Sequence, residues 1–191
     1  SSASAHVLDL PHSGTTAWSD GILAADGLIY CIPFSAGSVL IIDVAAPSVD
    51  STSMDNLGST PNGKWGAAAL AHNGLIYAVP LNSDAVLIID PIRCKTDTTL
   101  IVTSGCSATM KWGGAVRALN GNISGIPRQA PSILVIDPVA NVASLIDAPG
   151  GSSPGQLGSE RWSGGALAPN GKIFGAPSDA SRVLGIQAAS V

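Results

Sequence analysis

A passage that begins with tryptophan recurs four times along the chain. The tryptophans are Trp18, Trp65, Trp112 and Trp162, separated by 47, 47 and 50 residues. The passages read WSDGILAADGLIYCIPFSAGSVLIID, WGAAALAHNGLIYAVPLNSDAVLIID, WGGAVRALNGNISGIPRQAPSILVID and WSGGALAPNGKIFGAPSDASRVLGIQ. Small residues, an Asp-Gly or Asn-Gly pair, a proline and a Val/Ile/Leu run recur in register. Periodicity of this length is typical of repeat proteins, in which each repeat forms one structural unit.

Each repeat predicts the same succession of short β-strands. A first strand, 21–24 in the first repeat, leads into the Asp-Gly or Asn-Gly pair, which suits a hairpin turn with positive φ. A second strand ends at the proline, since proline cannot donate to a central ladder. A third strand is expected at 39–42, 86–89, 133–136 and 183–186, and a weaker fourth at 98–102 and 143–146. Glycine and proline interrupt every helical candidate, so we expect an all-β chain.

Four strands in a repeat of this length are typical of a β-propeller blade. We therefore expect one domain over 1–191, a four-bladed propeller of four-stranded antiparallel blades, with repeats at about 17–63, 64–110, 111–160 and 161–191. The last repeat lacks residues for a fourth strand, and 5–10 form a candidate strand. We expect this N-terminal strand to complete the last blade and close the ring; the alternative is a frayed extension. The chain is a monomer or homodimer on this view, because four blades could also be half of an eight-bladed pair, or part of a longer array.

The second and third strands carry a family resemblance. The passages IYCIP…SVLIIDVA, IYAVP…AVLIIDPI and ISGIP…SILVIDPV resemble the blades of YVTN-, NHL- and kelch-like propellers. The chain lacks the literal Y-V-T-N and the double glycine of kelch blades, so the subfamily stays open. The resemblance implies a binding platform in most cases and an enzyme in some. Four is also the blade number of hemopexin-like domains, although the hemopexin repeat itself is not visible.

Composition excludes several functions. The chain is 46% apolar and 12% charged, and its net charge is −4. It has no basic stripe for nucleic acid and no apolar run of the ~18 residues that span a membrane, so we expect neither partner. Histidine and cysteine spacings match no metal motif, so we expect no metal and no cofactor, except that a narrow channel could hold an ion of unknown identity.

The cysteines and the first residues indicate little about location. We expect three free thiols, with a bridge from Cys94 to Cys106 as the alternative. Residues 1–6 lack the basic and apolar parts of a targeting peptide, so any such peptide is expected to have been removed. The compartment stays open, with an extracellular one favoured.

Topology predicts one face on which binding residues gather. The start of each first strand, the loops between second and third strands, and the connections between repeats should converge there, and loops on a rigid scaffold commonly bind ligands. The alternative for each tryptophan is packing between blades, and for each cation it is covering the indole. The candidate ligand-binding residues on this face are Trp18, Trp65, Trp112, Trp162, Lys64, Lys111 and Arg161.

Two arginines break the repeat. Arg117 stands where the other repeats have leucine, and Arg128 has no charged equivalent. A buried arginine must be paired or bind an anion. We therefore add both arginines to the ligand-binding candidates, with drift or salt bridging as the alternative. The aspartates that end three third strands, Asp43, Asp90 and Asp137, are interpreted as turn formers.

Two functions follow from this pattern. The first is a non-enzymatic binding module that recognises a carbohydrate, another small ligand or a protein on the tryptophan-side face. The second is a hydrolase or lyase with one asymmetric site near the channel mouth, around Arg117 and Arg128. Multivalent binding should preserve the fourfold pattern, whereas a single site should break it. No catalytic residue is assigned, since no nucleophile and base stand out in the sequence.

Overall fold

The repeats fold into four antiparallel sheets. The structure is a computed structural model that describes residues 7–10, 16–60, 62–103, 106, 108–150 and 160–188. Sheet 1 has the order β1-β2-β3-β4, sheet 2 β5-β6-β7-β8, sheet 3 β9-β10-β11-β12, and sheet 4 β13-β14-β15. The bounds are β1 Trp18–Leu23, β2 Leu28–Pro33, β3 Leu40–Asp43, β4 Ser48–Asp50, β5 Trp65–Leu70, β6 Ile76–Pro80, β7 Leu87–Asp90, β8 Lys95–Asp97, β9 Trp112–Arg117, β10 Ile123–Pro127, β11 Ser132–Asp137, β12 Val142–Asp147, β13 Trp162–Leu167, β14 Lys172–Pro177 and β15 Leu184–Gln187.

The all-β prediction is confirmed over these residues. Every strand pairs antiparallel with its neighbour, and none of the described residues is helical. A membrane-spanning helix is accordingly not found in the part of the chain that the structure describes. All three cysteines are free, as expected.

The predicted hairpins form at all four positions. Gly27, Gly74, Gly121 and Gly171 have φ between +79° and +89°, which glycine adopts without a Cβ penalty. The residue before each glycine accepts a backbone hydrogen bond through its side chain; for example, Leu75 N–H donates to Asn73 Oδ1 at 3.0 Å. Each Asx-Gly pair therefore fixes the register of the first two strands of its sheet.

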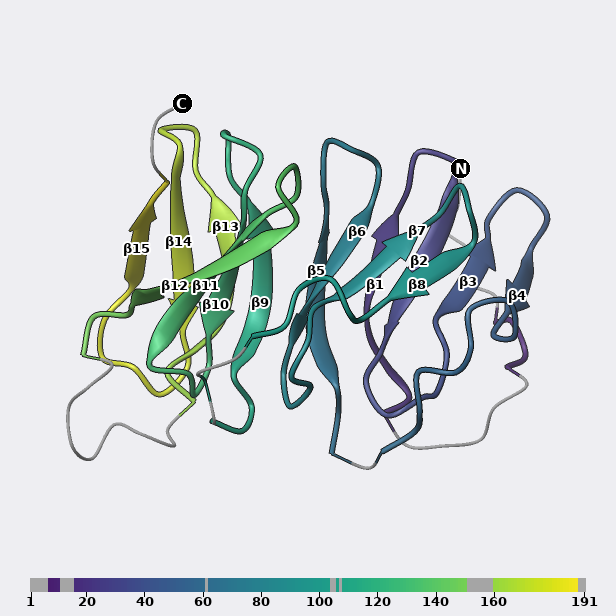
Figure 1. Cartoon of the computed structure of the whole chain (residues 1–191), viewed down its shortest axis with the longest axis horizontal. Helices are drawn as coiled ribbons and strands as arrows, with labels where there is room; N and C mark the ends of the chain where they lie inside the picture. The colour runs from purple at the N-terminus through teal and green to yellow at the C-terminus, as the bar shows by residue number, and fades with distance from the viewer. Residues whose placement is uncertain are drawn as a thin grey trace, which may run out of the picture.

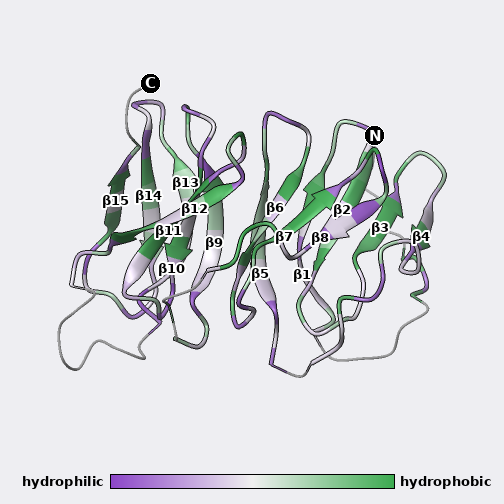
Figure 2. Ribbon diagram, viewed as in Figure 1, coloured by the Kyte–Doolittle hydropathy of each residue, from purple (hydrophilic) through white to green (hydrophobic). Residues whose placement is uncertain are grey.

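The core lies in three junctions between successive sheets. The first strands contact one another in chain order, β1 with β5, β5 with β9 and β9 with β13 (Figure 1). Each junction holds its own apolar cluster, centred on Trp65, Trp112 or Trp162. Figure 2 shows the second and third strands as the most hydrophobic ones, since they supply most of the buried side chains. The sheets therefore stack face to face like propeller blades, with the small residues of the first strands along one side.

The expected fourth strand of the second repeat is wrong. Residues 98–100 form a bend, and the strand is β8, just before them. Asp97 is the cause, because its Oδ1 accepts the backbone N–H of Thr99 at 2.6 Å and of Leu100 at 3.2 Å. This Asx turn ends the strand. Only a single bridge between Ala85 and Val102 remains of the expected pairing.

Ring closure by the N-terminal strand is not found among the described residues. Sheet 4 has three strands, residues 7–10 form none, and Val7 is 91% exposed; residues 5 and 6 lie outside the described part. Sheets 1 and 4 occupy opposite ends of the row (Figure 1). Three face-to-face spacings of about 10 Å separate them, and residues 7–10 do not pair with β15. The four sheets form an open row.

Candidate ligand-binding face

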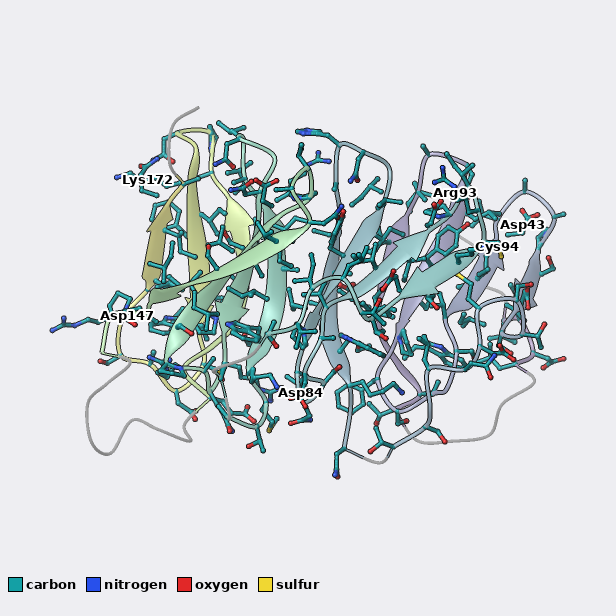
Figure 3. All side chains as sticks on the ribbon, viewed as in Figure 1. Asp43, Asp84, Arg93, Cys94, Asp147 and Lys172 are labelled. Atoms are coloured by element: carbon teal, nitrogen blue, oxygen red, sulfur yellow. The ribbon has the colours of Figure 1, made fainter. Side chains whose placement is uncertain are left out.

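The topology places the predicted binding residues on one face. In each sheet the tryptophan that starts the first strand pairs with the proline that ends the second, as in Trp65 with Pro80. The loops that follow the prolines therefore lie beside the tryptophans, opposite the hairpin turns. We call this surface the tryptophan-side face; Figure 3 shows Asp84 on it and Lys172, next to a hairpin turn, at the other edge.

The four indoles occupy equivalent positions. Trp65, Trp112 and Trp162 are 2%, 0% and 4% exposed. Each of the four donates from Nε1 to a backbone carbonyl of its own sheet at 2.8 to 2.9 Å; the acceptors are Ser38, Ala85, Ser132 and Arg182. The structure thus places three indoles inside junctions, as the packing alternative anticipated. Trp18 differs, because no sheet precedes it among the described residues and it is half-buried. Ligand binding by these residues stays a prediction.

The cations before the tryptophans are also buried. Lys64, Lys111 and Arg161 are 9%, 2% and 3% exposed. Lys64 Nζ donates to the Ala36 carbonyl at 2.5 Å and to the Gly58 carbonyl at 2.7 Å. Burial lowers the pKa of the Lys64 ammonium, because removal from water disfavours its charged form.

Arg161 repeats this arrangement one junction later. Its guanidinium donates to the carbonyl of Ala130, which is the equivalent of Ala36, and lies 4.9 Å from the centre of the Trp162 ring. Burial lowers the Arg161 pKa as well. We call this contact the cation clip. It ties the loop of one sheet to the first strand of the next, so it gives Lys64 and Arg161 a structural role.

A cavity opens on this face at the junction of sheets 1 and 2. Its volume is ≈ 270 Å³. Two predicted residues, Lys64 and Trp65, line it. The other walls are Asn56, Leu57, Ser83, Asp84, Ala85 and Thr98.

A second cavity of ≈ 380 Å³ lies near the hairpin side of the same junction. Asp26, Tyr30 and Cys94 are among the residues that line it.

The walls of the tryptophan-side cavity are mostly polar at its rim. The Asp84 side chain is 94% exposed, and its Oδ1 lies 3.8 Å from Lys111 Nζ. Ser83 donates from its hydroxyl to the Ala85 carbonyl at 3.2 Å. Asn56 and Thr98 add an amide and a hydroxyl. The rim can therefore both donate and accept hydrogen bonds, while Leu57 supplies an apolar wall.

The two arginines that break the repeat lie far apart. Arg117 Nη1 donates to the Leu70 carbonyl at 2.7 Å, next to a hairpin turn. Arg128 follows β10 on the tryptophan-side face, where its Nη2 lies 2.6 Å from Glu160 Oε2. β9 separates the two positions, and six strand residues span roughly 17 Å. The structure does not bring Arg117 and Arg128 together.

Arg128 and Arg161 retain donors without a partner. Arg128 Nε and both Nε and Nη1 of Arg161 are buried and form no hydrogen bond. The two residues are adjacent, because Arg161 N–H donates to the Arg128 carbonyl at 2.9 Å. Buried donors without partners are uncommon in proteins, so this part of the face can donate further hydrogen bonds to a ligand or water.

The aspartates behave as turn formers. Asp43 Oδ1 accepts the backbone N–H of Ala45 at 2.8 Å, and Asp137 Oδ1 accepts that of Val139 at 2.8 Å. Asp90 pairs with Arg93 at 2.8 Å. Over the described residues, no group of three or more His, Cys, Asp or Glu side chains is placed to hold a metal ion.

Sequence reasoning missed both the cavities and Glu160. Asn56, Leu57 and Glu160 come from connections between repeats, which share no pattern from one repeat to the next. One signal was readable near the hairpin-side cavity. Asp26 replaces the Asn73 of the next repeat, and Tyr30 donates to Asp26 Oδ2 at 2.8 Å. Burial and this carboxylate raise the Tyr30 pKa.

Comparison with solved structures identifies the architecture. A catalytically inactive virginiamycin B lyase from Staphylococcus aureus, solved with quinupristin, matches with a TM-score of 0.68 at 11% identity, over 96% of this chain and 59% of that one. A streptogramin B lyase matches with a TM-score of 0.67 at 12% identity, over 95% and 58%. The fold is that of a β-propeller. Identity this low shows the fold alone.

Proteins of another kind share the architecture. An auxiliary nutrient binding protein from Bacteroides ovatus matches the propeller with a TM-score of 0.56 at 12% identity, over 90% of this chain and 38% of that one. The chain thus spans less than two thirds of each of these proteins. No protein-family model matches the sequence, and no curated protein is similar to it.

Proposed function

We propose that this propeller is a non-enzymatic binding module whose tryptophan-side face takes a small polar ligand, with carbohydrate as the first class to test. The observation that carries the proposal is the ≈ 270 Å³ cavity between sheets 1 and 2. It is somewhat smaller than the pockets of roughly 300 to 1,000 Å³ that take drug-sized ligands, which suits a single sugar ring.

The chemistry of the rim supports a neutral, hydroxyl-rich ligand. Sugar hydroxyls both donate and accept, and the exposed Asp84 carboxylate, the Asn56 amide and the Thr98 hydroxyl offer both functions. Lys64 already donates to two carbonyls, so it would act on a ligand through its positive charge more than through a free hydrogen-bond donor. The nutrient-binding propeller among the similar structures is consistent with such a ligand.

Titration calorimetry with a panel of monosaccharides tests the proposal. We expect binding with a stoichiometry near one, since one cavity carries the argument. Asp84→Asn should weaken it by roughly 10-fold or more, because a hydrogen bond to a charged group contributes about 1.5 to 3 kcal/mol. Asp147→Asn is the matched control, an exposed carboxylate on β12 (Figure 3). No binding at millimolar sugar, or equal loss in both variants, would contradict the proposal.

The enzymatic alternative keeps one specific observation. Arg128 pairs with Glu160 at one junction only among the described residues, and two similar structures are lyases. A hydrolase or lyase site would then be centred on Arg128 without Arg117. Turnover of a bound ligand, lost in Glu160→Gln and kept in Asp147→Asn, would favour this alternative over simple binding.

A further inference from the structure

The hairpin-side cavity takes no part in the proposed function. Asp26, Tyr30 and Asp43 line it from sheet 1, and Pro91 and Cys94 line it from the loop between β7 and β8 of sheet 2 (Figure 3). Its volume of ≈ 380 Å³ lies within the range of roughly 300 to 1,000 Å³ that is typical of pockets for small organic ligands.

The next junction shows which contacts the repeat makes at this position. In sheet 2, Asn73 Nδ2 donates to the Tyr77 hydroxyl at 3.1 Å and to the Pro138 carbonyl of sheet 3 at 3.2 Å. The Tyr77 hydroxyl lies 3.3 Å from both the Pro138 carbonyl oxygen and Asn141 Oδ1. An N–H donor from the hairpin therefore joins sheet 2 to the loop of sheet 3.

The junction of sheets 1 and 2 lacks this donor. The equivalents of Asn73, Tyr77, Pro138 and Asn141 are Asp26, Tyr30, Pro91 and Cys94. The Tyr30 hydroxyl donates to Asp26 Oδ2 at 2.8 Å, and a carboxylate has no N–H to offer to the carbonyl of the loop. In the described part of the chain, no hydrogen bond joins Asp26 or Tyr30 to residues 90–94. The cavity therefore lies where the repeat elsewhere places a donor, beside groups that accept.

The wall of the cavity carries negative charge beside apolar surface. Asp26, Asp43 and Asp50 all line it, and none of the three has a salt bridge within the residues that the structure describes. Asp50 pairs with Ile41 on β3, two residues from Asp43, so both carboxylates lie on the same face of sheet 1. Leu28 and Ile41 supply the apolar surface. A complementary ligand therefore combines a positive charge with an apolar part.

Sheet 2 compensates the equivalent of Asp43 with cations of its own. This equivalent is Asp90, which pairs with Arg93 at 2.8 Å and stands opposite Lys95 on β8. In sheet 1 both cation positions hold neutral residues, Ala46 and Ser48. Arg93 belongs to the loop that lines the cavity, but its guanidinium is bonded to Asp90. The positive charge that sheet 2 contains is therefore missing from sheet 1.

We propose that the hairpin-side cavity binds a small organic cation, a primary ammonium group on a short apolar or aromatic chain. The ammonium has three N–H donors, so it can supply the donor that Asn73 supplies in the next junction and pair with the carboxylates. Its hydrocarbon part would pack against Leu28 and Ile41. A bare metal ion is less suitable, because no three His, Cys, Asp or Glu side chains converge on one point among the described residues. The proposal does not depend on the proposed carbohydrate ligand.

Titration calorimetry with benzylamine tests the proposal, and benzyl alcohol serves as the uncharged ligand of similar size. We expect benzylamine to bind at one site, at least roughly 10-fold more tightly than the alcohol, because hydrogen bonds to charged groups are the stronger ones. Asp26→Asn should weaken benzylamine binding by a similar factor, since the new amide supplies the missing donor and removes one charge. This variant should fold, as circular dichroism can check, because asparagine stands at this position in the other three repeats.

Asp137→Asn is the matched control. Asp137 is the equivalent of Asp43 in sheet 3 and lies outside the cavity, so its variant should bind benzylamine as the unchanged chain does. Absence of benzylamine binding at millimolar concentration, equal binding of benzyl alcohol, or unchanged affinity in Asp26→Asn would overturn the proposal. An equal loss in Asp137→Asn would also overturn it, because the amine would then be attracted only by the net charge of −4.

Alkylation of Cys94 gives a second readout of the position of the ligand. Cys94 is exposed and lines the cavity. Benzylamine should slow the reaction of this thiol with iodoacetamide, measured by peptide mass spectrometry, and should have little effect in Asp26→Asn. An unchanged rate at saturating benzylamine would place the amine elsewhere and overturn the site. Failure of sugars to bind the tryptophan-side cavity would leave both results unaffected.

Discussion

A single methyl group at the junction of sheets 3 and 4 should measurably destabilise the protein. A Cβ on Gly114 would lie 2.8 Å from the Cα of Gly164 and 3.2 Å from Cγ1 of Ile126. Carbon atoms prefer about 3.5 to 4.0 Å, so the two first strands would have to separate by roughly 1 Å. Overpacking of this kind costs about 1 to 3 kcal/mol.

Gly164→Ala is the matched control. Its Cβ meets no atom within 4 Å, and neither glycine has positive φ. Both changes restrict the unfolded chain equally, so the difference between the variants isolates the clash. In thermal unfolding we expect Gly114→Ala to melt roughly 2 to 12 °C below Gly164→Ala. Equal melting temperatures would refute the idea that close approach of the first strands sets the junction.

Three further outcomes are expected. Trp112→Phe should destabilise more than Trp18→Phe in urea unfolding, because Trp112 is fully buried and donates to the Ser132 carbonyl. Arg117→Leu should leave ligand affinity unchanged in calorimetry, since Arg117 lies at the hairpin end of β9. Hydrogen bonds lower the Asp50 pKa from 3.8 to about 2, so the stability it adds is present above pH 3.8 and lost as the pH falls through 2. Asp50→Asn should lessen that acid sensitivity, measured as urea midpoints.

The sheets could be predicted because their determinants are local and repeated. The Asx-Gly pairs fix the hairpins, and the tryptophans recur because each of the three junctions buries an indole at the equivalent position. The strand expected at 98–102 failed because one side chain, Asp97, captures two backbone N–H groups and ends the strand early. Apolar character alone does not reveal such a turn.

The candidate site was harder to predict because it depends on irregular connections. Residues 56 and 57 reach the cavity only through the fold, and no repeat supplies an equivalent pattern. The burial of Lys64 and Arg161 could not be predicted either. The sequence pattern of a cation beside a tryptophan is the same whether the cation covers the ring in solvent or bonds a loop carbonyl. Closure by 5–10 was expected from strand counting, which carries no information on how far apart the end sheets lie.

The cation clip gives the stack a direction. Each clip extends from a later sheet to the loop of an earlier one, as Lys64 does to Ala36 and Arg161 to Ala130. During synthesis, the cation of each clip would therefore find its carbonyl partner in a sheet that has already been made. Its clip would not have to wait for later residues. Removal of sheets from the C-terminal end would also remove the cations of their clips. Removal of sheet 1, in contrast, would leave the buried Lys64 ammonium without its Ala36 partner.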